Sequence, residues 1–188
     1  MERGPIVSGK IMTIIVGLME GKEAYIASDG RVSASTEIIN CATTDHKIFH
    51  FGKLVMGCAG TIRTMQIIRD NLNLPVQAAS QTDCAYLSMA FVKAMEVLYT
   101  ESAIKESDKI HCILGYNSKI YRVSPEWSIT EPTFATIGSG GKYASGALVA
   151  SFLLKAKLTP EKRLRLAVNA AAQCDSGCGD SFHMVKVQ

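Results

Sequence analysis

The segment from Thr13 to Arg31, which reads TIIVGLMEGKEAYIASDGR, decides the fold. Its first part, up to Met19, is apolar or β-branched, and such runs favour an extended strand that is buried in a core. Gly21 supplies a turn, after which a second extended run follows. The segment therefore predicts a hairpin whose second strand ends on an acidic residue, Asp29.

The rest of the chain continues from this hairpin as alternating groups of strands and helices. Apolar runs predict strands over 54–58, 111–115, 119–123, 133–137 and 181–187. Helical spacing predicts helices over 82–100 and 142–157, and two more that begin after Thr61 and Thr159. The order of the elements along the chain is strands, two helices, strands, two helices and a final strand. This order favours an α+β domain in which helices cover layered sheets.

Composition limits the classes of protein to consider. The chain has 188 residues, of which 47% are hydrophobic and 20% are charged, as is usual for one globular domain. A net charge of +3 without a run of Lys and Arg predicts no nucleic-acid binding. The apolar run 11–19 lacks the ending of a signal peptide and is shorter than the about 20 residues of a membrane span, so we expect no membrane insertion.

The six cysteines are scattered, and most lie in apolar stretches. This usage is typical of reduced thiols that pack as small hydrophobic groups in a cytoplasmic protein. Cys174, Cys178 and His183 can be read as metal ligands, but their spacing matches no common zinc pattern and no fourth ligand is apparent. We therefore expect neither a metal nor a cofactor.

Six short pieces of the sequence occur together in a characteristic order. They are Thr13-Ile14-Ile15-Val16-Gly17, Ser28-Asp29-Gly30-Arg31, Lys47-Ile48, Gly57-Cys58-Ala59-Gly60, Ile137-Gly138-Ser139-Gly140-Gly141 and Asp175-Ser176-Gly177-Cys178-Gly179. On these pieces the chain resembles the β-type proteasome subunits, including the bacterial ring peptidase that works with an ATP-driven unfoldase. Each piece alone is a weak signal, whereas six in register, from Thr13 to the last strand, are specific.

The resemblance implies a fold and a domain organisation. The fold is that of the N-terminal nucleophile hydrolases, a four-layer αββα sandwich of two packed, mainly antiparallel sheets with helices on both outer faces. Residues 13–188 form a single peptidase domain. Residues 1–12 are a leader, removed by autocatalytic processing, or translation begins at Met12, because the loss of an initiator methionine also exposes Thr13.

The resemblance also implies how the site works. Thr13 is the nucleophile, and its free α-amine is the base that takes the hydroxyl proton. The charge of Lys47 stabilises the activated hydroxyl, and Asp29 pairs with Lys47 and holds it charged. Ser139 and Asp175 orient the α-amine, as the third member of a catalytic triad orients its base.

Further positions are assigned to the substrate and to support of the site. The N–H of Gly60 faces the oxyanion of the tetrahedral intermediate. Arg31 and Ser33 flank a substrate that binds as an added strand, and Cys58 forms the floor of a specificity pocket suited to apolar side chains. Cys178 stands where many proteasome subunits have a serine, and its thiol is a weaker hydrogen-bond partner for the amine.

Each residue alone also has an ordinary structural interpretation. Asp29 suits a turn, Lys47 a solvated surface, Ser139 the entry to a helix and Thr13 a strand. Only their joint occurrence favours catalysis. Besides Cys178, two features depart from the family pattern. Two extra residues lie between Asp29 and Lys47, so that the loop around 37–43 shapes the cleft differently. Met12 replaces the usual glycine before the nucleophile.

The resulting prediction is a threonine-type endopeptidase subunit of a self-compartmentalised protease. Copies associate into one ring or two stacked rings, and an ATPase unfoldase of the AAA+ class delivers unfolded polypeptides. One alternative is an amidohydrolase or transpeptidase with a narrower substrate, because a fold does not fix its substrate. The other is an inactive structural ring subunit in which Thr13 stays blocked.

Overall fold

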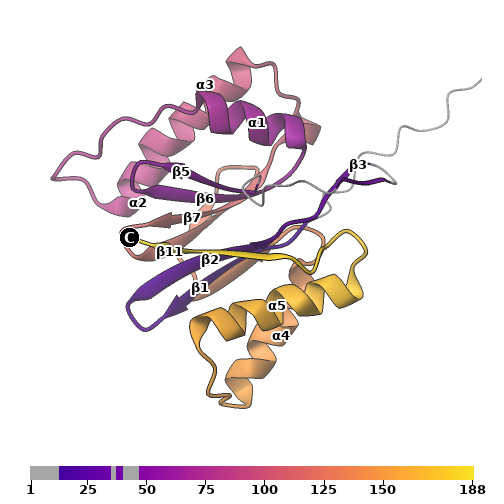
Figure 1. Cartoon of the computed structure of the whole chain (residues 1–188). Helices are drawn as coiled ribbons and strands as arrows, with labels where there is room; N and C mark the ends of the chain where they lie inside the picture. The colour runs from indigo at the N-terminus through magenta and orange to yellow at the C-terminus, as the bar shows by residue number, and fades with distance from the viewer. Residues whose placement is uncertain (1–12, 35–36, 40–46) are drawn as a thin grey trace, which may run out of the picture.

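Four layers build the domain in the computed structural model, which describes residues 13–34, 37–39 and 47–188. Figure 1 shows helices α1 and α3 over one sheet, a second sheet beneath it, and helices α4 and α5 on the opposite outer face. The four-layer αββα sandwich predicted from the sequence is confirmed. Helices on both outer faces leave the space between the two sheets as the inner core.

The first sheet has four antiparallel strands in the order β10-β1-β2-β11. Its strands are β1 (Ile15–Glu20), β2 (Glu23–Asp29), β10 (Phe134–Ile137) and β11 (Phe182–Val187). The predicted first hairpin is present, with Ile15 opposite Ser28, and Gly21 takes a φ of +63° in its turn. β1 lies between β10 and β2, so the residue before β1 is flanked by the ends of both neighbours.

The second sheet has five antiparallel strands in sequence order. They are β5 (Ile48–Phe51), β6 (Leu54–Ala59), β7 (His111–Tyr116), β8 (Lys119–Val123) and β9 (Ile129–Thr130). Asn117 and Ser118 join β7 to β8 with φ of 46° and 58°, as a two-residue hairpin turn requires. A separate two-stranded ribbon is formed by β3 (Val32–Ala34) and β4 (Glu37–Ile39). Neither that ribbon nor β5 and β9 were predicted.

The helices begin where the sequence supplies caps. They are α1 (Ile62–Asn71), α2 (Asp83–Tyr86), the π-helical segment η1 (Leu87–Phe91), α3 (Val92–Glu101), the short 3-10 helix η2 (Glu106–Asp108), α4 (Gly141–Leu153) and α5 (Pro160–Cys174). The side chains of Thr61, Thr82 and Thr159 accept backbone N–H bonds at three of the starts. The predicted helix over 82–100 is thus continuous but contains a π turn, and the one over 142–157 ends earlier, at Leu153.

Three apolar clusters hold the layers together. One joins the five-stranded sheet to α1–α3, another joins the four-stranded sheet to α4 and α5, and the third lies between the sheets. The sheets approach closely at Gly57, where an added Cβ would lie 2.6 Å from Cγ2 of Ile15. A glycine is required there because any side chain would push apart the strands that lead to Thr13 and Gly60.

Candidate active site

Thr13 lies two residues before β1 and is held through its own backbone. Its carbonyl oxygen accepts a hydrogen bond from the N–H of Gly140 at 3.3 Å. Gly138 takes a φ of +95°, and a Cβ at that position would lie 2.2 Å from the same carbonyl oxygen. The glycine-rich loop after β10 therefore packs directly against the backbone of Thr13, and only 4% of Thr13 is exposed.

One carboxylate oxygen of Asp29 connects the predicted catalytic groups. Oδ1 accepts hydrogen bonds from the Thr13 hydroxyl at 3.0 Å, from the Ile14 N–H at 3.0 Å and from Nζ of Lys47 at 2.5 Å. Asp29 is completely buried at the end of β2. The structure thus brings Thr13, Asp29 and Lys47 together, as the sequence predicted.

The other oxygen of Asp29 is held by backbone groups. Oδ2 accepts hydrogen bonds from the N–H of Gly179 at 2.8 Å and from the N–H of Arg31 at 3.3 Å. A carboxylate whose two oxygens accept several N–H bonds is fixed in one orientation. Asp29 is therefore a rigid anionic anchor between the hydroxyl of Thr13 and the ammonium of Lys47.

Lys47 is the buried cation of this group, with 3% of its surface exposed. Burial lowers the pKa of its ammonium, and the neighbouring charge of Asp29 opposes that effect. A lysine with a lowered pKa that remains paired with a carboxylate can place positive charge beside a developing alkoxide. This is the role expected from the sequence, and the ion pair with Asp29 supports it.

Ser139 and Cys178 lie on the nitrogen side of Thr13. The N–H of Thr13 donates to Oγ of Ser139 at 3.4 Å, a long contact that still places the hydroxyl next to the future amine. A Cβ added at Gly140 would lie 2.5 Å from Sγ of Cys178, and burial raises the pKa of the Cys178 thiol to about 12. The thiol is therefore neutral at physiological pH and acts as a weak hydrogen-bonding group, as expected.

Asp175 is placed differently from the prediction. Its Oδ1 accepts the N–H of Gly177 at 2.8 Å, and its carbonyl accepts the N–H of Cys178 at 2.9 Å. Within the described ranges, its side chain makes no hydrogen bond to Thr13. Because an aspartate at a helix end satisfies the following N–H groups first, Asp175 shapes the loop that carries Cys178 rather than contacting the amine.

The predicted substrate-binding positions fall on both sides of this centre. Gly60 directly follows β6, and an added Cβ would lie 2.4 Å from Cγ2 of Ile110, so the site tolerates only glycine there. Nη1 of Arg31 donates to the carbonyl of Ser176 at 2.8 Å, which connects the segment after β2 to the loop after α5. The backbone of Ser33 belongs to β3, and its side chain lies outside the described part of the structure.

Cys58 lies in β6, on the face that packs against the helices α1 and α3. Its thiol is completely buried and packs in the cluster under α1 and α3, together with Met56 and Met65. Burial raises its pKa well above the ordinary value, so it is an inert neutral thiol. Its role as the floor of a specificity pocket stays a prediction. β6 is buried on both faces, so the sequence does not indicate which face a given side chain joins.

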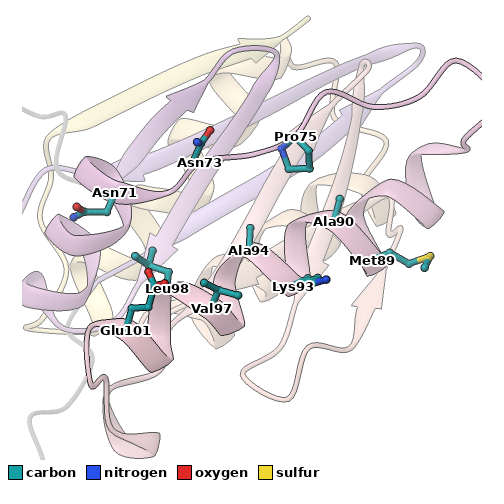
Figure 2. A pocket seen from close by; sticks show the side chains of 10 residues that line it. All are labelled: Asn71, Asn73, Pro75, Met89, Ala90, Lys93, Ala94, Val97, Leu98 and Glu101. Atoms are coloured by element: carbon teal, nitrogen blue, oxygen red, sulfur yellow. The ribbon is translucent and has the colours of Figure 1, made fainter.

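Two cavities were not anticipated. One of about 440 Å³ adjoins the site, because Gly138 and Ser139 form part of its wall. Another, of about 630 Å³, lies on the outer helical layer between the end of α1, Pro75 and the helix that carries Met89 and Val97 (Figure 2). None of the predicted site residues lines the second cavity, so it is separate from the catalytic centre.

Two other expectations concern metals and membranes. Among residues 13–34, 37–39 and 47–188, no three His, Cys, Asp or Glu side chains are grouped so as to hold a metal ion. Over the same ranges, no helix has both the length and the apolar character needed to cross a bilayer.

Comparisons with known proteins agree with this geometry. Over 169 residues, the chain is 25% identical to the ATP-dependent protease subunit HslV of Lactobacillus leichmannii, covering 87% of this chain and 92% of that protein. The Thiobacillus denitrificans protein BPH, solved in complex with epoxomicin, superposes with a TM-score of 0.80 at 19% identity, covering 94% and 98% of the two chains. HslV from Trypanosoma brucei superposes with a TM-score of 0.64 at 17% identity, covering 93% and 98%.

The four layers, together with a threonine before the first strand and a buried lysine–aspartate pair, define an N-terminal nucleophile hydrolase of the proteasome type. The model of the family described as Proteasome subunit matches residues 12–188, and the chain belongs to that family. The predicted family and enzyme class, a threonine-type peptidase subunit, are confirmed. The roles of individual residues stay predictions.

Proposed function

We propose that Thr13 is the nucleophile of this peptidase subunit and that its own α-amine is the general base. The observation that carries the proposal is the convergence of the Thr13 hydroxyl and the Lys47 ammonium on one oxygen of buried Asp29. A threonine hydroxyl is a weak nucleophile unless a base takes its proton and a charge stabilises the resulting oxygen. Lys47 supplies that charge, and Ser139 holds the nitrogen.

The reaction begins when the α-amine takes the hydroxyl proton and Oγ1 attacks the carbonyl carbon of the scissile peptide. The N–H of Gly60 stabilises the oxyanion that forms, and such a donor contributes about 3–4 kcal/mol. The protonated amine then gives its proton to the leaving nitrogen, and the C–N bond breaks. Water, activated by the same amine, hydrolyses the ester on Thr13 and restores the free hydroxyl.

The base exists only after the bond between Met12 and Thr13 is cut. While residues 1–12 are attached, the nitrogen of Thr13 is an amide and has no useful basicity. A free α-amine titrates near about 7.7–8.0 in peptides, so a neutral fraction is present at physiological pH. Residues 1–12 therefore control activity, whether they are a leader removed autocatalytically or sequence before an alternative start.

We also propose the assembly in which the site works. The HslV relative is named a subunit of an ATP-dependent protease. By analogy, copies of this chain form one ring or two stacked rings that enclose their sites, and an AAA+ unfoldase delivers unfolded polypeptides. Cys58, Cys84, Cys112, Cys174 and Cys178 are unpaired, which supports a reducing, cytoplasmic location.

The decisive experiment compares Thr13→Ala with the unchanged chain. We expect Thr13→Ala to lose at least about a thousandfold in the rate of hydrolysis of unfolded casein, because the nucleophile is gone. Thr13→Ser should retain measurable activity, since a hydroxyl remains, and Thr130→Ala on the exposed β9 strand is the matched control. A Thr13→Ala protein that keeps its activity would refute the assignment.

The intact mass of the purified protein tests the same proposal independently. We expect the active assembly to have a chain that begins at Thr13. The second candidate function, an inactive structural ring subunit, is favoured by the twelve residues before Thr13 and by Met12 in place of glycine. An assembled, inactive particle whose Thr13 is still preceded by Met12 would establish that alternative.

A further inference from the structure

A cavity of about 440 Å³ lies beside the glycine-rich loop that holds Thr13. Its wall combines the loop residues Gly138 and Ser139 with three basic side chains, His111, Arg122 and Lys142. We call it the basic cavity. The mechanism above uses Ser139 but none of the basic residues.

Strand register explains why basic residues distant in sequence meet here. Arg122 on β8 lies opposite Ile113 on β7, and residues opposite each other in an antiparallel pair share a face. His111 is two residues before Ile113 and lies on the same face. Ile113 packs in the cluster between the sheets together with Ile137, so this face points toward the four-stranded sheet. The basic cavity is therefore the open end of the layer between the sheets.

The charge of the basic cavity is not neutralised within the domain. Arg122 and Lys142 are exposed, and neither forms an ion pair with any carboxylate in the described ranges. Burial and the neighbouring charge of Arg122 lower the pKa of His111, and Glu126 opposes them. Two uncompensated cations with hydroxyl groups around them suit a carboxylate ligand.

The position of the basic cavity relative to Thr13 indicates which part of a substrate reaches it. Asp29 at the end of β2 and Ser139 after β10 flank Thr13 from opposite sides, because β1 lies between those strands. The leaving nitrogen must take its proton from the amine, so it lies within hydrogen-bonding reach of the nitrogen of Thr13. The peptide that follows the scissile bond therefore passes Ser139 and continues along the wall of the basic cavity.

We propose that the basic cavity is a subsite for an acidic side chain located just after the cleaved bond. This inference rests on the proposed function and extends it, because it assigns a substrate preference that the catalytic residues do not specify. Arg122 and Lys142 bind the carboxylate.

The test uses three peptides that are identical up to the cleaved bond and carry Glu, Gln or Lys in the residues just after it. We expect kcat/KM for the Glu peptide to exceed that for the Gln peptide by about three- to tenfold, the range for two partly solvated ion pairs. The ratio should fall at high salt. In Arg122→Gln/Lys142→Gln the ratio should fall to near one, and in Lys142→Glu the preference should shift toward the Lys peptide. The matched control, Lys162→Gln on the exposed start of α5, keeps the ratio of the unchanged chain.

A short peptide whose only group after the scissile bond is a small fluorescent amine separates the two proposals. If the unchanged chain cleaves it but does not distinguish Glu from Gln, the inference is overturned and the proposed function stands. If the short peptide is not cleaved at all, the proposed function fails. If Arg122→Gln/Lys142→Gln reduces the native mass of the assembly, the basic cavity is filled by a neighbouring copy, which also overturns the inference.

Discussion

At the scale of single residues, Asp29 is the group on which the geometry of the site depends. One of its oxygens accepts three hydrogen bonds, and the other accepts two backbone N–H groups. Lys47 is buried with it, so neither charge has water as an alternative partner. Removing one charge of such a pair is more costly than removing a surface pair, because the remaining charge stays buried.

We therefore expect Asp29→Asn to lose about 3–5 kcal/mol of unfolding free energy at pH 7. Denaturation with urea measures the loss. The control is Asp70→Asn, which breaks the exposed pair with Arg69 and should cost far less, because solvent screens that pair. Similar losses of unfolding free energy in the two variants would show that the Lys47–Asp29 pair contributes no more to stability than an exposed ion pair.

The pH dependence of that loss provides a second test. Burial lowers the pKa of Lys47, whereas Asp29 raises it, so Asp29→Asn should lower the pKa further. At every pH between the lowered pKa of Lys47 in the folded variant and its ordinary pKa in the unfolded chain, the unfolded chain binds a proton that the folded variant does not. The stability of the variant must rise with pH up to the ordinary lysine pKa. We expect the deficit of Asp29→Asn to shrink between pH 7 and pH 10, and a constant deficit would contradict the assignment.

At the scale of elements, the loop after β10 is what positions the nucleophile. Gly138 combines a positive φ with an approach that leaves no room for a Cβ against the backbone of Thr13. Gly21 has a similar φ of +63°, but its surroundings are open. A comparison of the same substitution at the two glycines therefore distinguishes the effect of backbone strain from the effect of a steric clash.

Gly138→Ala is expected to be destabilising and to reduce peptidase activity severely. Strain in the left-handed region costs about 1–2 kcal/mol, and the clash with the Thr13 carbonyl adds to it and moves the nucleophile. Gly21→Ala should show the strain alone and keep its activity. Urea denaturation and casein hydrolysis of both variants measure the difference, and equal activities would contradict the proposed role of the loop.

The same elements show how far sequence reasoning reached. The first hairpin was predictable because its apolar runs and Gly21 are local signals. The N-termini of two helices were predictable because Thr61 and Thr159 are caps. The side of the sheet on which Cys58 lies was not predictable, because β6 is buried on both faces and its sequence does not alternate between apolar and polar residues. The basic cavity was hidden as well, since His111, Arg122 and Lys142 meet only through strand register.

At the scale of the whole molecule, exposed apolar side chains gather at the end of α4. Leu153 and Leu154 are 77% and 79% exposed, and Val149 and Phe152 on the same helix are partly exposed. A monomer gains nothing from leucines in water, whereas each leucine that is buried against another copy contributes about 1.5–3 kcal/mol. We therefore expect the end of α4 to be a contact surface between copies in the proposed assembly.

Leu153→Asp should therefore shift the assembly toward smaller species without unfolding the subunit. The reason is that burying an unpaired carboxylate between copies is unfavourable, while the same side chain is solvated in a monomer. Native mass and circular dichroism, recorded over a range of protein concentrations, measure the two effects separately. Val76→Asp is the matched control, because Val76 is 97% exposed on the segment between α1 and α2, on the opposite helical layer. If Leu153→Asp keeps its full native mass while Val76→Asp dissociates, copies meet through the α1–α3 layer instead of through α4.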